Sequence, residues 1–326
     1  MWWIPSLYLA EGLPYIAVNT LSTILYKNMG MSNEDLAFYT GWLYLPWVIK
    51  PFWSPFVDII KTKRWWTLAT QLFMGIAFAA LAFVLPLNSY LQFSLAIFWL
   101  IGFLSATHDI AADGFYMLAL DSSDQSLYVG IRSAFYRLAT ILGQGGIVMV
   151  AGYLESTTQN IPLSWAITFA TLSILFLLIT FYHTLILPKP SADRPSVDPR
   201  KRGSVLKAFF GTFHSFFKKR GVWIAILFIL LYRFPESQLV KMINPFFLDP
   251  VEQGGLSMNT TQVGLVYGTI GIIGLTLGGI LGGIIVSRIG LKRSLWPMAL
   301  SLTLPCAVFC WMSISQPDPN NLMNMI

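Results

Sequence analysis

Residues 103–120 read FLSATHDIAADGFYMLAL, an apolar stretch that carries two aspartates and a histidine. Together with the apolar residues upstream, it forms a segment from about 91 to 118 that is long enough to cross a bilayer as a helix. Asp109 and Asp113 lie four residues apart, so one helical face carries both acids. A charge at mid-bilayer costs about 3 kcal/mol, so both acids are expected to pair or to line a wet cavity.

The composition of the chain excludes a soluble domain. Hydrophobic residues make up 55% of the 326 residues and charged residues 11%, whereas soluble domains typically carry about 25% charged residues. We therefore predict an all-α polytopic membrane protein. Cys306 and Cys310 share one face of an apolar segment and are interpreted as core residues, because a metal site needs more ligands. No metal, cofactor or nucleic-acid partner is expected.

Nine apolar segments are long enough to be transmembrane helices, which need about 20 residues each. Their approximate ranges are 3–25, 35–57, 66–87, 91–118, 127–153, 164–187, 221–247, 259–286 and 294–314.

Basic residues are concentrated on one side of this arrangement. Fifteen of the 21 Lys and Arg residues fall in the connections 61–64, 189–220 and 288–293. Loops on the opposite side carry one base, Lys27, among several acids. Because cytoplasmic loops are enriched in Lys and Arg, we predict that the N-terminus faces the cytoplasm.

A Pro-rich, charged connection divides the spans into six and three. It reads PKPSADRPSVDPRKRGS from residue 188 and lacks the apolar residues that a core requires. After it, residues 205–220 place phenylalanines on one helical face and basic residues on the other, which predicts an amphipathic helix on the inner membrane surface. The predicted domains are a six-helix bundle at 1–187, a cytoplasmic linker at 188–220 and three helices at 221–326.

Charges inside the predicted spans lie at matching depths. Asp113 and Arg132 are each about one and a half turns from the cytoplasmic ends of two adjacent antiparallel helices. Asp109 and Arg137 are each about three turns from the same ends. Depth therefore predicts the pairs Asp113–Arg132 and Asp109–Arg137.

Glu11 and Lys50 are also level with each other, near the middle of the first two spans. Two roles remain open for these charges. The pairs either pin neighbouring helices together, or at least one acid carries protons inward with a substrate. His108 points about 100° away from Asp109 around the helix, so a His/Asp metal site is not expected.

The seventh span contains YRFPESQLVK, with Arg233, Glu236 and Lys241 around a proline that frees a backbone carbonyl. Arg233 can hold a carboxylate or phosphate through two bonds, or it can neutralise Glu236 three residues away. Gln144 and several aromatic residues lie at compatible depths and can contact a sugar or peptide, although packing is the commoner role of a single aromatic. In the eighth span, Gly264, Gly268, Gly271, Gly278 and Gly282 share a face that permits close helix approach.

The segments SPFVDIIKTKR (54–64) and GIIVSRIGLKR (283–293) align without gaps. The segments LYLAEGLP (7–14) and LLYRFPES (230–237) also correspond, since each places a Tyr, a charge and a helix-breaking Pro around mid-membrane. Internal repeats with proline-interrupted spans are typical of secondary transporters, which bind substrate near the midplane. The repeated loop resembles the signature of the major facilitator superfamily. That resemblance implies twelve helices in two halves, of which about nine are present here in an incomplete chain.

In that superfamily the signature loops form a cytoplasmic gate between the halves. The resemblance assigns this gate to Asp58, Lys61, Arg64, Arg288 and Arg293, and Ser287 stands where the second loop usually has an acid. The alternative is that the basic residues only anchor the topology.

Five segments resemble one branch of the superfamily, the AmpG-type muropeptide permeases. They are AEGLPY (10–15), KPFWSPFVD (50–58), RWWTLATQ (64–71), SATHDIAADGF (105–115) and GIRSAFYRLATILGQGG (130–146). The resemblance implies proton-driven uptake of anhydro-muropeptides across the bacterial inner membrane for peptidoglycan recycling. His108 departs from the family pattern, in which a neutral residue such as Gln stands there.

The sequence thus predicts a proton-coupled transporter, acting as a monomer in the lipid bilayer, and not an enzyme. The alternatives are a transporter of another anionic solute, such as acetyl-coenzyme A or a drug-like compound, and a transporter-like membrane sensor. The residues predicted to bind substrate or carry protons are Glu11, Lys50, Asp109, Asp113, Arg132, Arg137, Gln144, Arg233, Glu236 and Lys241.

Overall fold

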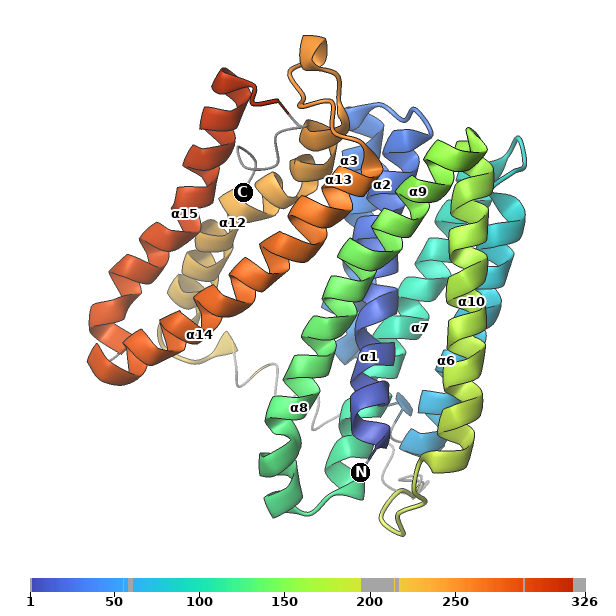
Figure 1. The fold of residues 1–326 in the computed structure, drawn as a ribbon. Helices are drawn as coiled ribbons and strands as arrows, with labels where there is room; N and C mark the ends of the chain where they lie inside the picture. The colour runs from blue at the N-terminus through green and yellow to red at the C-terminus, as the bar shows by residue number, and fades with distance from the viewer. Residues whose placement is uncertain are drawn as a thin grey trace.

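The computed structural model describes residues 2–54, 56–57, 61–194, 214, 217–289 and 291–318. Within these residues the chain is built from helices, with no strand, as Figure 1 shows. The helical elements are α1 (Trp3–Ile16), η1 (Ala17–Leu21), α2 (Ser22–Asn28), α3 (Asn33–Trp42), α4 (Leu45–Ile49), η2 (Lys50–Phe52), α6 (Lys63–Val84), α7 (Tyr90–Ala119), α8 (Ser122–Ile141), η3 (Leu142–Ile147), α9 (Val148–Thr158), α10 (Ile161–Ile186), α12 (Val222–Leu248), η5 (Val251–Gln253), α13 (Thr260–Val263), η6 (Gly264–Ile270), α14 (Gly271–Ile289) and α15 (Leu291–Ser315).

The all-α fold class is confirmed, and a helical stretch overlaps each of the nine predicted ranges in the described part of the chain. Five helical stretches are long and apolar enough to cross a membrane, judged by length and composition. The total of twelve helices stays a prediction. The amphipathic helix predicted from residue 205 falls largely outside the described residues.

The predicted span at 35–57 is interrupted. α3 ends at Trp42 and α4 begins at Leu45, with Pro46 in its first turn. Proline suits this position because its missing N–H has no partner in the first turn of a helix. The break turns the chain so that Lys50 begins a short 3₁₀ turn instead of continuing the helix.

Polar caps set the starts of several spans. The side chain of Thr62 accepts a hydrogen bond from the backbone of Trp65 at the start of α6, and Asn160 does the same for Leu163 at α10. Asn259 and Gln262 form a reciprocal capping box at α13. Each cap satisfies donors that the first turn of a helix leaves without partners, so an apolar run begins at a defined residue.

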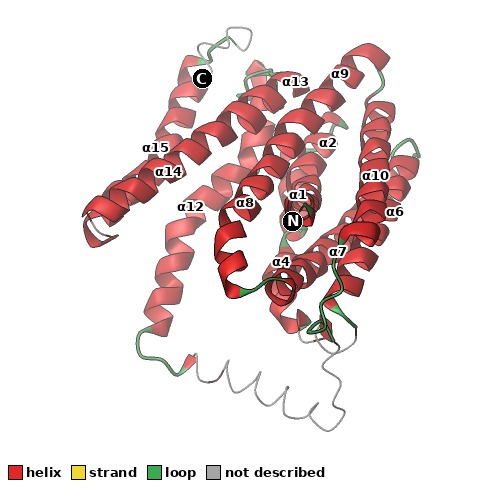
Figure 2. Ribbon diagram, turned by 60° about the horizontal axis from the view of Figure 1, so that its bottom comes forward, coloured by secondary structure: helices red, strands yellow, loops and turns green. Residues whose placement is uncertain are grey.

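The helices form two groups, which Figure 1 shows side by side. One group contains α1 to α10, and buried rings of Phe78, Phe98 and Phe169 join α6, α7 and α10 in its core. The other contains α12, α14 and α15, and Figure 2 shows these three helices together from a second direction. Large apolar side chains such as Phe83 and Phe181 remain exposed on the outside, which fits helices that face lipid.

The two groups are in close contact where η3 and α9 meet η6 and α13. A Cβ atom on Gly268 would collide with the backbone carbonyl of Gln144, and a Cβ on Gly264 would lie 3.0 Å from the carbonyl oxygen of Gly145. The predicted close approach is therefore confirmed at Gly264 and Gly268. It does not extend to Gly278, where a Cβ would meet nothing within 4 Å.

Three π-helical turns gather at this junction. η1, η3 and η6 each widen their helix locally, and η3 contacts both η1 and η6. The Gln144 Nε2 of η3 donates to Thr20 Oγ1 of η1 at 3.0 Å. Because π-bulges are rare and often mark functional sites, the junction between the two helix groups is a candidate functional site.

Candidate functional site

One predicted charge pair is confirmed. Arg132 of α8 approaches Asp113 of α7 with 2.7 Å between Nη2 and Oδ1. The hydroxyl of Tyr8 on α1 donates to the same carboxylate oxygen at 3.1 Å, and the guanidinium lies 4.6 Å from the Tyr8 ring centroid. Three helices therefore meet around one ion pair.

The predicted pair Asp109–Arg137 is wrong. Asp109 instead pairs with Lys50, with 3.5 Å between Oδ2 and Nζ, and Arg137 Nη1 donates to Thr276 Oγ1 of α14 at 3.4 Å. Each arginine matched its predicted partner in depth, but only Arg132 also matched in direction around the helix. Residues 132 and 137 are five apart, about 140° around a helix, so α8 cannot turn both toward α7.

The buried acid Glu11 makes no ion pair with Lys50 or with any other base among the described residues. Its residue is 8% exposed, and its Oε2 atom has no hydrogen-bond partner. Glu11, Tyr8, Arg132 and Arg137 line a cavity of about 470 Å³ that Leu275 of α14 closes from the other group. We call it the acid cavity.

A second cavity of about 480 Å³ lies between the groups. Tyr15 of α1, Gln144 of η3 and Tyr267 of η6 line it together with Lys241 and Asn244 of α12. We call it the amide cavity. Lys241, Gln144 and Tyr15 thus line one cavity, and their role in binding stays a prediction.

Two histidines belong to a buried polar chain that crosses four helices of one group. Gln71 of α6 contacts His108 of α7 at 2.9 Å through their Nε2 atoms and His183 of α10 at 2.9 Å. The second ring nitrogen of His183 lies 2.9 Å from the hydroxyl of Ser6. His108 therefore points into the helix bundle and away from Asp109.

The residues predicted for the cytoplasmic gate are placed only in part. Arg64 donates to the carbonyl oxygens of Thr184 and Leu187 at the end of α10, at 2.8 and 3.2 Å, within one helix group. Lys61 and Arg293 are exposed. Asp58 lies outside the described residues, so a gate between the groups stays a prediction.

The predicted binding residues of the seventh span are also placed only in part. α12 contains Arg233 and Glu236, but their side chains are outside the described part of the structure, as is that of Arg288 on α14. Lys241 Nζ donates to the carbonyl oxygen of Thr40 on α3 at 3.3 Å.

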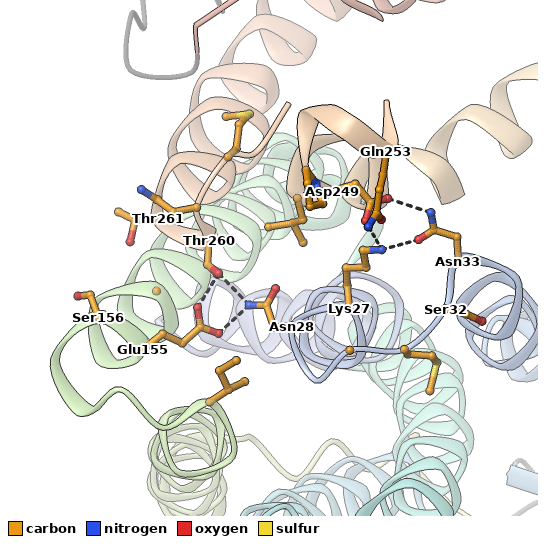
Figure 3. Close-up of a pocket in the computed structure, with 18 of the residues that line it drawn as sticks. Lys27, Asn28, Ser32, Asn33, Glu155, Ser156, Asp249, Gln253, Thr260 and Thr261 are labelled. Carbon is orange, nitrogen blue, oxygen red and sulfur yellow. Dashed lines mark hydrogen bonds and ion pairs between the residues drawn. The ribbon is translucent and has the colours of Figure 1, made fainter. Parts of the chain in front are cut away.

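A polar cluster that the sequence analysis missed joins the two groups at the end opposite the N-terminus (Figure 3). Lys27 of α2 forms an ion pair with Asp249, the residue that ends α12, and donates to Asn33 Oδ1 at 2.7 Å. Asn33 in turn donates to Asp249 Oδ2 at 2.8 Å. Lys27, the one base among acids in the loops of that side, was the signal that could have found this contact.

Glu155 extends the same cluster. Its Oε1 atom accepts from Asn28 at 2.6 Å and from the Trp165 indole at 2.7 Å, and its Oε2 accepts from Thr260 of α13 at 2.6 Å. We call the set Lys27, Asn28, Asn33, Glu155, Asp249 and Thr260 the latch. It connects α2, α3 and α9 with α12 and α13, and the latch residues line a cavity of about 1140 Å³ at this end.

Gly30 allows the backbone turn that lies between the latch residues Lys27 and Asn33. It follows α2 with φ of +87°, a left-handed conformation that favours glycine. The backbone N–H of Met31 then bonds the carbonyl of Tyr26 at 3.0 Å, which ends the helix and turns the chain toward α3. This turn places Lys27 and Asn33 on the same side of the loop.

No group of three or more His, Cys, Asp or Glu side chains gathers closely enough to hold a metal among the described residues. What the site offers chemically is a set of buried charges beside two cavities, with a closed contact between the helix groups above them.

Comparison with known families identifies the class of protein to which these two helix groups belong. Residues 7–324 match the Major Facilitator Superfamily, so the chain belongs to this superfamily. The predicted superfamily is confirmed, and the chain is accordingly a membrane transporter with transmembrane helices.

The relatives narrow the resemblance further. "Putative transporter AmpG 4" of Rickettsia conorii is 24% identical over 319 residues, which are 95% of this chain and 73% of the relative. The anhydromuropeptide permease of Escherichia coli K12 is 26% identical over 293 residues, 88% of this chain and 55% of the permease. The AmpG-type resemblance is therefore confirmed, and these relatives are named as transporters.

A solved structure shares the fold. A bacterial homologue of the human lysosomal transporter Spinster, in an inward-facing and unoccupied conformation, matches with a TM-score of 0.67 and 15% identity. The match covers 89% of this chain and 63% of that one.

Proposed function

We propose that the chain is a secondary active transporter of the bacterial inner membrane that takes up anhydro-muropeptides together with protons. One observation carries the proposal. Glu11 is a buried carboxylate with an unpartnered oxygen, and it lines a cavity between two helix groups. An ionisable residue inside a membrane protein is by default a candidate for ion or proton movement.

The neighbouring charges explain why Glu11 is the chosen acid. Asp113 is neutralised by Arg132, and Asp109 by Lys50. Glu11 has no such partner among the described residues, so it is free to take up a proton when the cavity opens to one side and to release it when the cavity opens to the other. The substrate class comes from the similarity to the Escherichia coli permease.

The latch is the proposed closure on the periplasmic side. The ends of α6, α10 and α14 that adjoin the connections rich in Lys and Arg lie on the side of the N-terminus in Figure 1, whereas α2 and α13 lie on the opposite side. The positive-inside rule then puts the N-terminus in the cytoplasm and the latch outside. Rocking of one helix group against the other would open the latch and close the cytoplasmic end, where Asp58, Lys61, Arg64, Arg288 and Arg293 are proposed to form the gate.

The same scheme gives the proposed domains. Residues 1–187 and 221–326 supply the two moving groups, and residues 188–220 form the linker between them in the cytoplasm. The protein is proposed to work as a monomer, because both cavities are bounded within one chain.

The decisive experiment measures uptake of a labelled anhydro-muropeptide into right-side-out and inverted membrane vesicles under an imposed proton gradient. We expect saturable accumulation that a protonophore abolishes, and this result would also exclude the role of a sensor without transport. Folded protein that accumulates no anhydro-muropeptide would overturn the substrate assignment. Labelled acetyl-coenzyme A is then the next compound to measure.

Glu11→Gln tests the coupling. We expect it to abolish accumulation against a gradient and to leave exchange of labelled for unlabelled substrate intact, because the neutral amide binds no proton but changes the cavity little. Glu34→Gln, at an exposed acid of α3, is the matched control and should accumulate substrate normally. Normal accumulation by Glu11→Gln would remove Glu11 from the coupling.

A further inference from the structure

The amide cavity has the size and lining of a ligand site. Its volume of about 480 Å³ lies within the usual range for small-molecule pockets, about 300–1,000 Å³. Tyrosine rings and polar side chains from both helix groups line it, and Lys241 is the one charged residue among its described lining. The cavity therefore favours a ligand that is anionic and rich in hydrogen-bonding groups.

Asn244 supplies an independent sign of a ligand. The residue is 4% exposed, and its Oδ1 atom has no hydrogen-bond partner. An unsatisfied buried acceptor costs about 1–3 kcal/mol, so a fold that keeps one beside a cavity is prepared for an incoming N–H or O–H donor.

Lys241 supplies the positive charge. Within the described residues its contact is the backbone carbonyl of Thr40, 3.3 Å from Nζ, and no carboxylate lies within ion-pair distance. A neutral carbonyl leaves the charge of the ammonium group uncompensated. An ammonium group in this position attracts a carboxylate entering the cavity.

The side chains of Lys241 and Asn244 are close enough to bind one ligand together. Lys241 and Asn244 are three residues apart on α12, so their side chains leave the same face of the helix about 5–6 Å apart at Cβ. Opposite them, the rings of Tyr15 and Tyr44 meet edge to face with centroids 6.3 Å apart. Tyr44 is 44% exposed, and aromatic surface of this kind suits the apolar face of a sugar ring.

We propose that Lys241 and Asn244 form an anchor for a carboxylate that stands next to an N–H donor, as at the C-terminus of a peptide, with the attached sugar against the tyrosines. The anchor rests on the proposed function, because it assigns the peptide end of an anhydro-muropeptide to the amide cavity.

The test uses purified protein in detergent without any gradient, so that it is independent of coupling. The two probes are N-acetyl-anhydromuramyl-L-alanine, which has one carboxylate, and its C-terminal amide. We expect the wild-type protein to bind the acid about 10- to 100-fold more tightly than the amide, as a charged hydrogen bond would give.

The variants then separate the two anchor groups. Lys241→Gln should bind both probes with the weak affinity of the amide, whereas Lys241→Arg should keep the preference for the acid. Asn244→Leu should weaken both probes to a similar extent, because both carry the same amide N–H. Ser237→Ala alters a lining side chain that already donates to the backbone of Phe234, and should bind like the wild type.

The outcomes distinguish the anchor from the transport function. Equal binding of acid and amide by the wild type, unchanged in Lys241→Gln, would overturn the anchor while anhydro-muropeptide uptake stands. Binding of neither probe by folded wild-type protein would overturn both the substrate assignment and the anchor.

Discussion

The ion pairs of this transporter fall into two sets that share chemistry and differ in what they join. Asp113–Arg132 and Asp109–Lys50 connect elements of one helix group, whereas Lys27–Asp249 connects the two groups. The pair between the groups is also the more buried, with side chains 14% and 8% exposed against 31% and 40% for Arg132 and Asp113.

This difference separates fixed contacts from moving ones. A pair inside one group keeps its geometry when the groups rock, so it can hold charges beside the cavity in every state. A pair between groups must break and re-form in each cycle, so its strength sets the balance between states. Burial makes the latch strong in the state seen here, and exposure leaves Arg132 accessible from the acid cavity.

The largest effect on uptake is expected at Gly268, where the two helix groups are in close contact. Gly268→Leu would force a side chain into the backbone of Gln144. Overpacking of this kind costs about 3 kcal/mol, so we expect closure at the latch end to be disfavoured about 100-fold and uptake to be lost. Gly274→Leu on the same span meets nothing within 4 Å at its Cβ and serves as the control. Equal uptake by both variants would show that transport does not need the close contact at Gly268.

Breaking the latch should have an intermediate effect. Asp249→Asn removes the charge that compensates buried Lys27, at a cost of about 2 kcal/mol, which shifts the population toward the state open at that end about 30-fold. Distances between spin labels at positions 34 and 253 would record the shift. Asp35→Asn alters a neighbouring acid that contacts Ser32 within its own loop and should leave the distances unchanged. If Asp249→Asn gave the same distance distribution as the wild type, the latch would not control the balance between the closed and open states at that end.

Breaking a pair inside one group should have the smallest effect and should not change the state. Lys50 is 37% exposed and 3.5 Å from Asp109, so Lys50→Gln should lower the free energy of unfolding by about 1 kcal/mol. The double variant Lys50→Gln, Asp109→Asn removes the uncompensated charge and should recover most of that loss. Thermal unfolding in detergent measures both. A shift of the spin-label distances in Lys50→Gln would contradict the division into fixed and moving pairs.

Much of this organisation was predictable because the bilayer imposes strong rules on sequence. The apolar segments gave the helix ranges, and the depth of Asp113 and Arg132 gave their pairing. Depth failed for Asp109 because a kinked second span brought Lys50 to it instead. Pro46 lies just after the break between Trp42 and Leu45, so the sequence carried a sign of the break but not the direction in which the chain turns.

The latch and the anchor could not be predicted in the same way. Lys27 of α2, Glu155 of α9 and Asp249 at the end of α12 are far apart in sequence, and no local pattern indicates that they meet. The unpartnered oxygen of Asn244 is likewise a property of its surroundings. A polar residue in a span indicates an unfavourable free energy of burial, but only its neighbours in the fold decide whether hydrogen bonds or ion pairs offset it.

By itself the sequence determined the fold class, the helix ranges and the superfamily, because hydrophobic length, charge placement and motif spacing are properties of neighbouring residues. The tertiary structure alone decided which charges face each other, where the groups close and which polar atoms are left for a ligand. These depend on the direction of each side chain around its helix and on how two helix groups pack, and both are set by contacts between residues that are distant along the chain.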